Sequence, residues 1–169
     1  MKYYILIAIL FITGFGVEAQ NSGCNCCSEN HDDFDFWEGK WEVTNPDGTA
    51  AGMNTIVKMQ DGCVLMENWV GAKGKYTGTS VNFYNNKTKQ WEQLWVDNSG
   101  SYLKLSGKRT GNQMILRSEP FEGKDGKKYV NKITWSYNSD GTVRQLWEIY
   151  NNDTVVNVAF DGLYKKVGN

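Results

Sequence analysis

Residues 90–106 read Gln-Trp-Glu-Gln-Leu-Trp-Val-Asp-Asn-Ser-Gly-Ser-Tyr-Leu-Lys-Leu-Ser. Two segments rich in aromatic and apolar residues, 90–96 and 101–106, flank the turn formed by Asn98, Ser99 and Gly100. Aromatic and branched residues favour extended backbone, whereas Asn and Gly tolerate the positive φ angles of tight turns. This stretch therefore predicts a β-hairpin, and the pattern recurs along most of the chain.

Ten segments of this kind follow one another from residue 37 onward. They are 37–44, 53–60, 63–70, 77–84, 90–96, 101–106, 113–119, 128–137, 142–150 and 154–164. Asp-Gly pairs and Asn-rich corners separate them, as expected for strands joined by tight turns. No segment of twelve or more residues has a clean apolar period of 3.6, so the sequence predicts an all-β protein.

The strand count and the short turns favour one architecture, a ten-stranded antiparallel up-and-down barrel with an interior cavity. Closure removes the exposed sheet edges, and a barrel of ten strands encloses more space than its own side chains fill. A two-sheet sandwich is the alternative, but it needs longer crossing connections. Only residues 120–127 are long enough for one, so we expect the barrel.

Composition limits the classes of partner. The chain of 169 residues has a formal net charge of −1 and no basic run, which argues against nucleic acid or an anionic membrane surface. Its 7 Trp, 9 Tyr and 7 Phe, with 18 Gly and only 2 Pro, exclude a disordered or low-complexity chain. We expect one globular domain. No feature of the sequence indicates whether the protein is a monomer or an oligomer.

The N-terminus has the features of an export signal. One lysine precedes a short apolar run, and small residues at Val17 and Ala19 indicate cleavage before Gln20. We predict a signal peptide at 1–19, a Cys-rich lead-in at 20–33, the barrel at 34–164 and a tail at 165–169. The mature protein is then secreted or periplasmic and does not insert into a membrane. An uncleaved anchor is the alternative, although the run is short for a bilayer.

All four cysteines, Cys24, Cys26, Cys27 and Cys63, lie in the predicted mature chain. An even count in an oxidising compartment indicates disulfides, and four cysteines allow three connectivities. We expect Cys63 to bond to one of the other three, which would contribute roughly 4 kcal/mol through chain entropy. The alternative is a soft-metal site with His31. Because no second Cys-x-x-Cys pair or His cluster supports it, we predict no metal.

Three predicted strands share a triplet in which a carboxyl or amide residue stands two positions before a tryptophan. The triplets are Glu67-Asn68-Trp69, Gln93-Leu94-Trp95 and Gln145-Leu146-Trp147. Residues two apart in a strand face the same side, so each triplet places a polar group beside an indole. If these faces point inward, they line a polar and aromatic cavity. The candidate ligand-binding residues are Glu67, Trp69, Phe83, Trp91, Gln93, Trp95, Trp135, Gln145 and Trp147.

Such a lining suits a small, partly apolar ligand with a planar or apolar body, aromatic ligands included, and a polar end, bound without a cofactor. Two alternatives stay open: the tryptophans could be core packing, or they could face solvent. A different class of function is a cofactor-free isomerase, cyclase or hydrolase that uses Glu67 as acid or base, with a pKa raised by burial. The sole histidine, His31, precedes the first strand and offers no base for a Ser-His-Asp arrangement.

The segment Phe34-Asp35-Phe36-Trp37-Glu38-Gly39-Lys40-Trp41 resembles the opening Phe-Asp-Phe-Trp-x-Gly-x-Trp of a group of exported bacterial domains of unknown function. Further segments similar to that group are Gly62-Cys63-Val64-Leu65, Asn82-Phe83-Tyr84, the stretch from Trp91 to Asp97, Arg144-Gln145 with Trp147-Glu148, and Phe160-Asp161-Gly162-Leu163-Tyr164. The resemblance covers residues 34–164 and implies export, but no activity.

A looser resemblance concerns the fold. Gly39-Lys40-Trp41 is similar to the Gly-x-Trp of lipocalins, and the strand count is similar to that of fatty-acid-binding and nitrobindin-like barrels. These calycin-like relatives imply ligand storage or transport. Haem-binding barrels hold iron through a late histidine, which this chain lacks, and fatty-acid binders use a basic cluster where this chain has Glu and Gln. These two departures from the relatives argue against haem and against a fatty acid as the ligand.

Overall fold

The computed structural model describes residues 24–168, and the predicted signal peptide at 1–19 lies outside them. A four-residue helix and one 3₁₀ turn precede the strands. In chain order the elements are α1 (Glu29–Asp32), η1 (Asp35–Trp37), β1 (Gly39–Thr44), β2 (Ala50–Met59), β3 (Val64–Gly71), β4 (Thr77–Asn85), β5 (Gln90–Asp97), β6 (Tyr102–Thr110), β7 (Gln113–Arg117), β8 (Phe121–Glu122), β9 (Lys128–Tyr137), β10 (Val143–Asn151) and β11 (Thr154–Lys166). None of the helices described is long and apolar enough to cross a bilayer.

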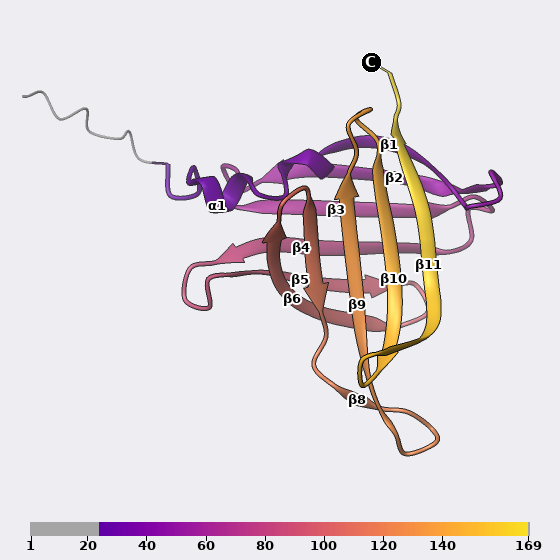
Figure 1. Ribbon diagram of the computed structural model, residues 1–169. Helices are drawn as coiled ribbons and strands as arrows, with labels where there is room; N and C mark the ends of the chain where they lie inside the picture. The colour runs from indigo at the N-terminus through magenta and orange to yellow at the C-terminus, as the bar shows by residue number, and fades with distance from the viewer. Residues whose placement is uncertain (1–23, 169) are drawn as a thin grey trace, which may run out of the picture.

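Ten of these strands close into one antiparallel barrel (Figure 1). Each strand from β1 to β6 pairs with the next, β7 pairs with β9, and β9, β10 and β11 follow in order. The barrel closes where β11 pairs with β1, with Val43 opposite Tyr164. The two-residue strand β8 pairs with the first residues of β9 and is not one of the ten. The all-β, up-and-down barrel predicted from the sequence is confirmed.

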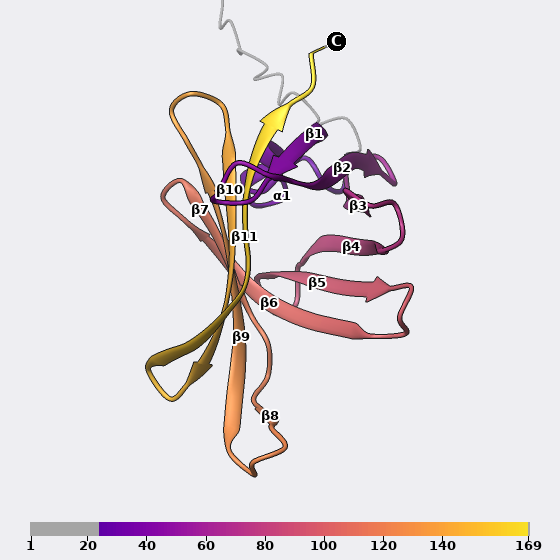
Figure 2. The ribbon, with the colours of Figure 1, turned by 90° about the vertical axis from the view of Figure 1, so that its right-hand side faces the viewer.

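Most strand ends differ from the prediction by a few residues, and two differences change the description of the barrel. Trp37, predicted to begin the first strand, belongs to η1, where its N–H donates to the carbonyl of Phe34 at 3.1 Å. Gly39 then leads the chain into β1 with a φ of 135°, a conformation that glycine adopts without a side-chain clash. The segment 120–127, predicted as a plain connection, contains β8, which projects with the start of β9 below the other strands in Figure 2.

Aromatic side chains close one end of the barrel. Phe34 and Trp37 are 0% exposed and stack with their ring centroids 4.9 Å apart. Phe34 also meets Trp91 and Trp135 edge to face. Trp91 Nε1 donates to the carbonyl of Asn30 in the lead-in at 2.9 Å. We call Phe34, Trp37, Trp91 and Trp135 the aromatic plug, because they remove from water the apolar area that an open end would expose.

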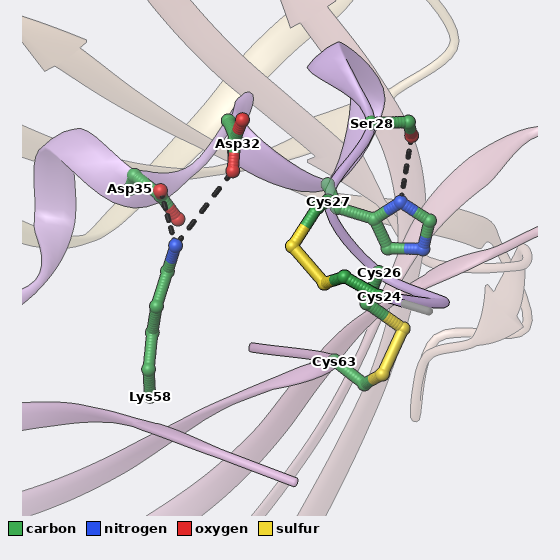
Figure 3. The surroundings of a disulfide bond; sticks show 9 residues. Cys24, Cys26, Cys27, Ser28, Asp32, Asp35, Lys58 and Cys63 are labelled. Carbon is green, nitrogen blue, oxygen red and sulfur yellow. Dashed lines mark hydrogen bonds and ion pairs between the residues drawn. A yellow bond between two sulfur atoms is a disulfide. The ribbon is translucent and has the colours of Figure 1, made fainter. Parts of the chain in front are cut away.

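One covalent bond and one ionic cluster fasten the lead-in to the barrel (Figure 3). The Cys26–Cys63 disulfide joins the lead-in to the turn between β2 and β3, across a sequence separation of 37. Lys58 on β2 forms ion pairs with Asp35 and, at 3.7 Å, with Asp32. A covalent loop of this size is stabilised by about 4 kcal/mol in the chain-entropy model. Two separate contacts with the β2–β3 hairpin therefore hold the lead-in against the barrel.

The second disulfide joins Cys24 to Cys27 within the lead-in. All four cysteines lie in the described part of the chain and are bridged, and Cys63 is bonded to one of the three partners considered above. The ring of His31 is hydrogen-bonded through Nδ1 to Ser28 Oγ at 2.7 Å. Over residues 24–168, no group of three or more His, Cys, Asp or Glu side chains is arranged to hold a metal ion.

Candidate ligand-binding cavity

The barrel encloses a cavity of about 570 Å³. Its outer lining comes from the turns β1–β2 and β3–β4, including Asn45, Ala72, Lys73, Lys75 and Tyr76. Both turns lie at the end of the barrel opposite the lead-in, because antiparallel strands alternate in direction. The cavity therefore opens at this end, which we call the mouth. The aromatic plug lies at the opposite end, and its member Trp135 also lines the cavity.

Four tryptophans from four different strands line the cavity: Trp69, Trp95, Trp135 and Trp147. Trp147 is oriented by a hydrogen bond from its Nε1 to Asn131 Oδ1 at 2.8 Å. The inward direction that strand alternation predicts for the three triplet tryptophans is thus found in the structure. Whether these side chains bind a ligand stays a prediction.

Two glycines, each on a strand that pairs with the tryptophan's own strand, leave room for the indole rings. A Cβ added at Gly78 would overlap the Trp95 ring, and one added at Gly52 would lie 2.7 Å from the Trp69 ring. The indoles therefore lie against bare backbone instead of extending across the barrel. This arrangement keeps the centre of the cavity open. In the sequence, it is indicated by the glycines on β2 and β4 against which the indoles lie.

Glu67 lies at the floor of the cavity and is 4% exposed. Its Oε1 accepts a hydrogen bond from Asn54 Nδ2 at 2.7 Å, and its Oε2 accepts one from Ser80 Oγ at 2.5 Å. No ion pair within residues 24–168 includes Glu67. Burial raises the pKa of Glu67 to about 7, and the two hydrogen bonds offset that rise only in part.

The hydrogen bonds continue from Glu67 across β4 to β5. Asn82 Nδ2 donates to Ser80 Oγ at 2.8 Å and to the Leu65 carbonyl at 3.0 Å. Gln93 Nε2 donates to Asn82 Oδ1 at 2.7 Å. The strand register creates this chain, because Glu67 stands opposite Ser80 and Asn82 stands opposite Gln93. Gln93 is therefore held in place beside the cavity by a partner that the triplet pattern did not reveal.

On the other side of Glu67 the network reaches β11 and β10. Asn54 Nδ2 lies 3.5 Å from the hydroxyl oxygen of Tyr164, and that hydroxyl donates to Gln145 Oε1. Burial, and then the nearby Glu67, raise the pKa of Tyr164 well above its ordinary value, so its hydroxyl is neutral at pH 7. The polar side chains of all three triplets thus belong to one network. We call this network the polar floor; its members are Asn54, Glu67, Ser80, Asn82, Gln93, Gln145 and Tyr164.

Two predicted site residues do not reach the cavity. Phe83 was assigned to the wrong face: Ser80 and Asn82 on the same strand point inward, so Phe83 is on the outer side, half-buried and opposite Glu92. Trp91 does face inward and is 2% exposed, but it belongs to the aromatic plug. The side chains brought together at the cavity are Glu67, Trp69, Gln93, Trp95, Trp135, Gln145 and Trp147.

Sequence reasoning missed several members of the site, namely Asn54, Ser80, Asn82, Phe160 and Tyr164. Alternation on β4 would have placed Ser80 and Asn82 inside the barrel once the register with β3 was known.

A family-model scan and a search of curated proteins find no match to this chain. The ten-stranded barrel is consistent with a calycin-like fold, but no family match supports the resemblance to exported bacterial domains.

Proposed function

We propose that the protein binds a small, partly apolar ligand, with aromatic ligands favoured, inside the barrel. The observation that carries the proposal is the cavity of about 570 Å³, with indole walls and the polar floor. Ligand pockets typically measure about 300–1,000 Å³ and combine apolar walls with a few oriented polar groups. The indoles would supply contact area, and the polar floor would orient the polar end of the ligand.

The proposal includes export to the periplasm or the outside of the cell. Its support is the predicted signal peptide at 1–19 together with the two disulfides, since disulfides form and persist in oxidising compartments. A binder outside the cytoplasm would meet its ligand directly, and the proposal needs no cofactor, nucleic acid or membrane partner.

The test is a fluorescence titration of the oxidised protein with N-phenyl-1-naphthylamine, a neutral aromatic probe. We expect a saturable rise in probe fluorescence, and Trp95→Ala should weaken binding by about tenfold because an aromatic contact is worth about 1 kcal/mol or more. Tyr102→Ala is the matched control, since Tyr102 is 71% exposed. A linear signal without saturation, or equal losses in both variants, would contradict the proposal.

A second candidate is acid–base catalysis, and one observation favours it. Glu67 faces the cavity and has no counter-ion in the part of the chain that the structure describes. Burial raises its pKa to about 7, which is the range suited to a general acid or base. Hydrolysis of p-nitrophenyl acetate tests the hydrolase form of this candidate. Turnover that Glu67→Gln lowers roughly 100-fold would support it. Turnover equal in Glu67→Gln and in the protein itself would exclude Glu67 from catalysis.

A further inference from the structure

The groups around Glu67 have no spare hydrogen to offer a ligand. The Ser80 hydroxyl hydrogen is directed at Glu67, and the Asn54 amide hydrogens are directed at Glu67 and Tyr164. The Tyr164 hydroxyl hydrogen is directed at Gln145. An oxygen atom of a ligand that reached Glu67 would therefore find no free donor on these three neighbours.

Acceptor positions, in contrast, are left over. An ionised carboxylate offers about four lone-pair positions, and Glu67 receives two hydrogen bonds. The Oδ1 atom of Asn54, on the amide that holds Glu67, is fully buried and has no partner in the described structure. Buried polar atoms without a partner are uncommon because they lose their hydrogen bonds to water. Glu67 lines the cavity and Asn54 lies behind it, so a ligand that brings several donors would supply the hydrogen bonds that Glu67 can still accept.

The floor also lacks a positive charge. The side chains that face Glu67 are Asn54 from β2, Ser80 from β4 and Tyr164 from β11, of which Tyr164 alone is titratable, and it is neutral at pH 7. The lysines that line the cavity, Lys73 and Lys75, are at the mouth and exposed to solvent, which screens their charge. Above the floor, the indole faces attract cations through their π electrons.

We propose that the ligand is a small primary amine in its protonated form, with its ammonium group against Glu67 and its apolar or aromatic body between the indoles of Trp69, Trp95 and Trp147. This inference rests on the proposed function, because it specifies the chemical class of ligand for the same cavity. An ammonium group brings one positive charge and three hydrogen-bond donors. It therefore supplies both the hydrogen-bond donors and the positive charge that the polar floor lacks.

The proposal has a defined pH dependence. An ammonium group stabilises the ionised form of Glu67, so binding lowers the pKa of Glu67 from about 7 and releases a proton. Aliphatic amines stay protonated up to about pH 10. Below pH 7 the affinity for the amine should fall by about tenfold per pH unit, as Glu67 becomes protonated.

Isothermal titration calorimetry with three probes on one ring system tests the proposal. The probes are 2-(1-naphthyl)ethylamine, 2-(1-naphthyl)ethanol and 1-naphthylacetate, which differ in charge at one end. At pH 8 we expect the amine to bind at least about tenfold more tightly than the other two, the effect of a charge-assisted hydrogen bond. Glu67→Gln should remove this preference and leave the affinity for the alcohol within about threefold. Glu42→Gln, at an exposed position on β1, is the matched control and should change neither affinity.

The pH series needs no variant and guards against a folding defect in Glu67→Gln. Amine affinity that falls below pH 7, with proton release in buffers of different ionisation enthalpy, would support the proposal. An alcohol that binds as tightly as the amine, or an amine affinity independent of pH, would overturn it while leaving the proposed function intact. Failure of all three probes and of N-phenyl-1-naphthylamine to bind would contradict the proposed function as well.

Discussion

The aromatic residues at the two ends of the barrel have opposite surroundings. In the plug, Phe34 and Trp37 are 0% exposed because the lead-in lies across the end of the barrel and fills it. Toward the mouth, Trp95 and Trp147 are half-buried and border the cavity, although they are the same residue type as Trp37. An inward-facing tryptophan therefore indicates a core or a binding site only once its neighbours are known.

The largest expected effect is a difference in the free energy of unfolding between a tryptophan variant in the plug and one at the cavity wall. Trp37→Ala should lower the free energy of unfolding by about 3–5 kcal/mol, the usual cost of truncating a fully buried aromatic side chain. Trp147→Ala, at the cavity wall, should cost clearly less because its ring is already half-exposed. Urea denaturation measures both values. Equal losses would mean that the cavity tryptophans are core residues.

The disulfide that holds the plug should have the next largest effect. Replacing Cys26 and Cys63 together by serine should lower the free energy of unfolding by about 2–4 kcal/mol, because the unfolded chain regains the freedom of the closed loop. Replacing Cys24 and Cys27, which close a much shorter loop, is the control and should cost less. Thermal unfolding of the two double variants checks the order, and the reverse order would be evidence against the Cys26–Cys63 pairing.

A smaller effect should appear at the cavity wall. Gly78→Ala places a methyl group where the Trp95 ring lies, so the ring must move into the cavity, at a cost of about 1–3 kcal/mol. Gly71→Ala, where the nearest atom is 3.3 Å away, should be milder. N-phenyl-1-naphthylamine binding should weaken in Gly78→Ala more than in Gly71→Ala. Unchanged binding in both variants would show that Trp95 does not border the occupied space.

The same comparison shows what the sequence could and could not reveal. Turn residues and strand-like composition were sufficient for the barrel, because each hairpin is specified by neighbouring residues. The plug was not foreseen, since the local pattern around Trp37 is typical of a strand and its 3₁₀ turn is stabilised by contacts distant in sequence.

The site was only half predictable for a related reason. Within each triplet, residues two apart must share a face of the strand, so the pattern assigned Glu67 and Trp69 to the same inward face. Asn54 and Ser80 could not be assigned in this way, since their inward position depends on the register between strands. Phe83 was misplaced because no triplet marks the inward face of its strand.

Glu67 is a carboxylate with no counter-ion among residues 24–168, and it lies at the floor of a ligand-sized cavity. Carbon-13 NMR of the Glu67 side-chain carboxyl, followed from pH 4 to pH 9 with Glu67→Gln to assign the signal, measures whether this carboxyl lacks a cation. We predict a pKa of about 7 for Glu67 in the free protein, raised from its ordinary 4.5 by burial, and a lower pKa when 2-(1-naphthyl)ethylamine is bound. A pKa near 4.5 in the free protein would place the carboxyl in water or beside a cation and would contradict the account.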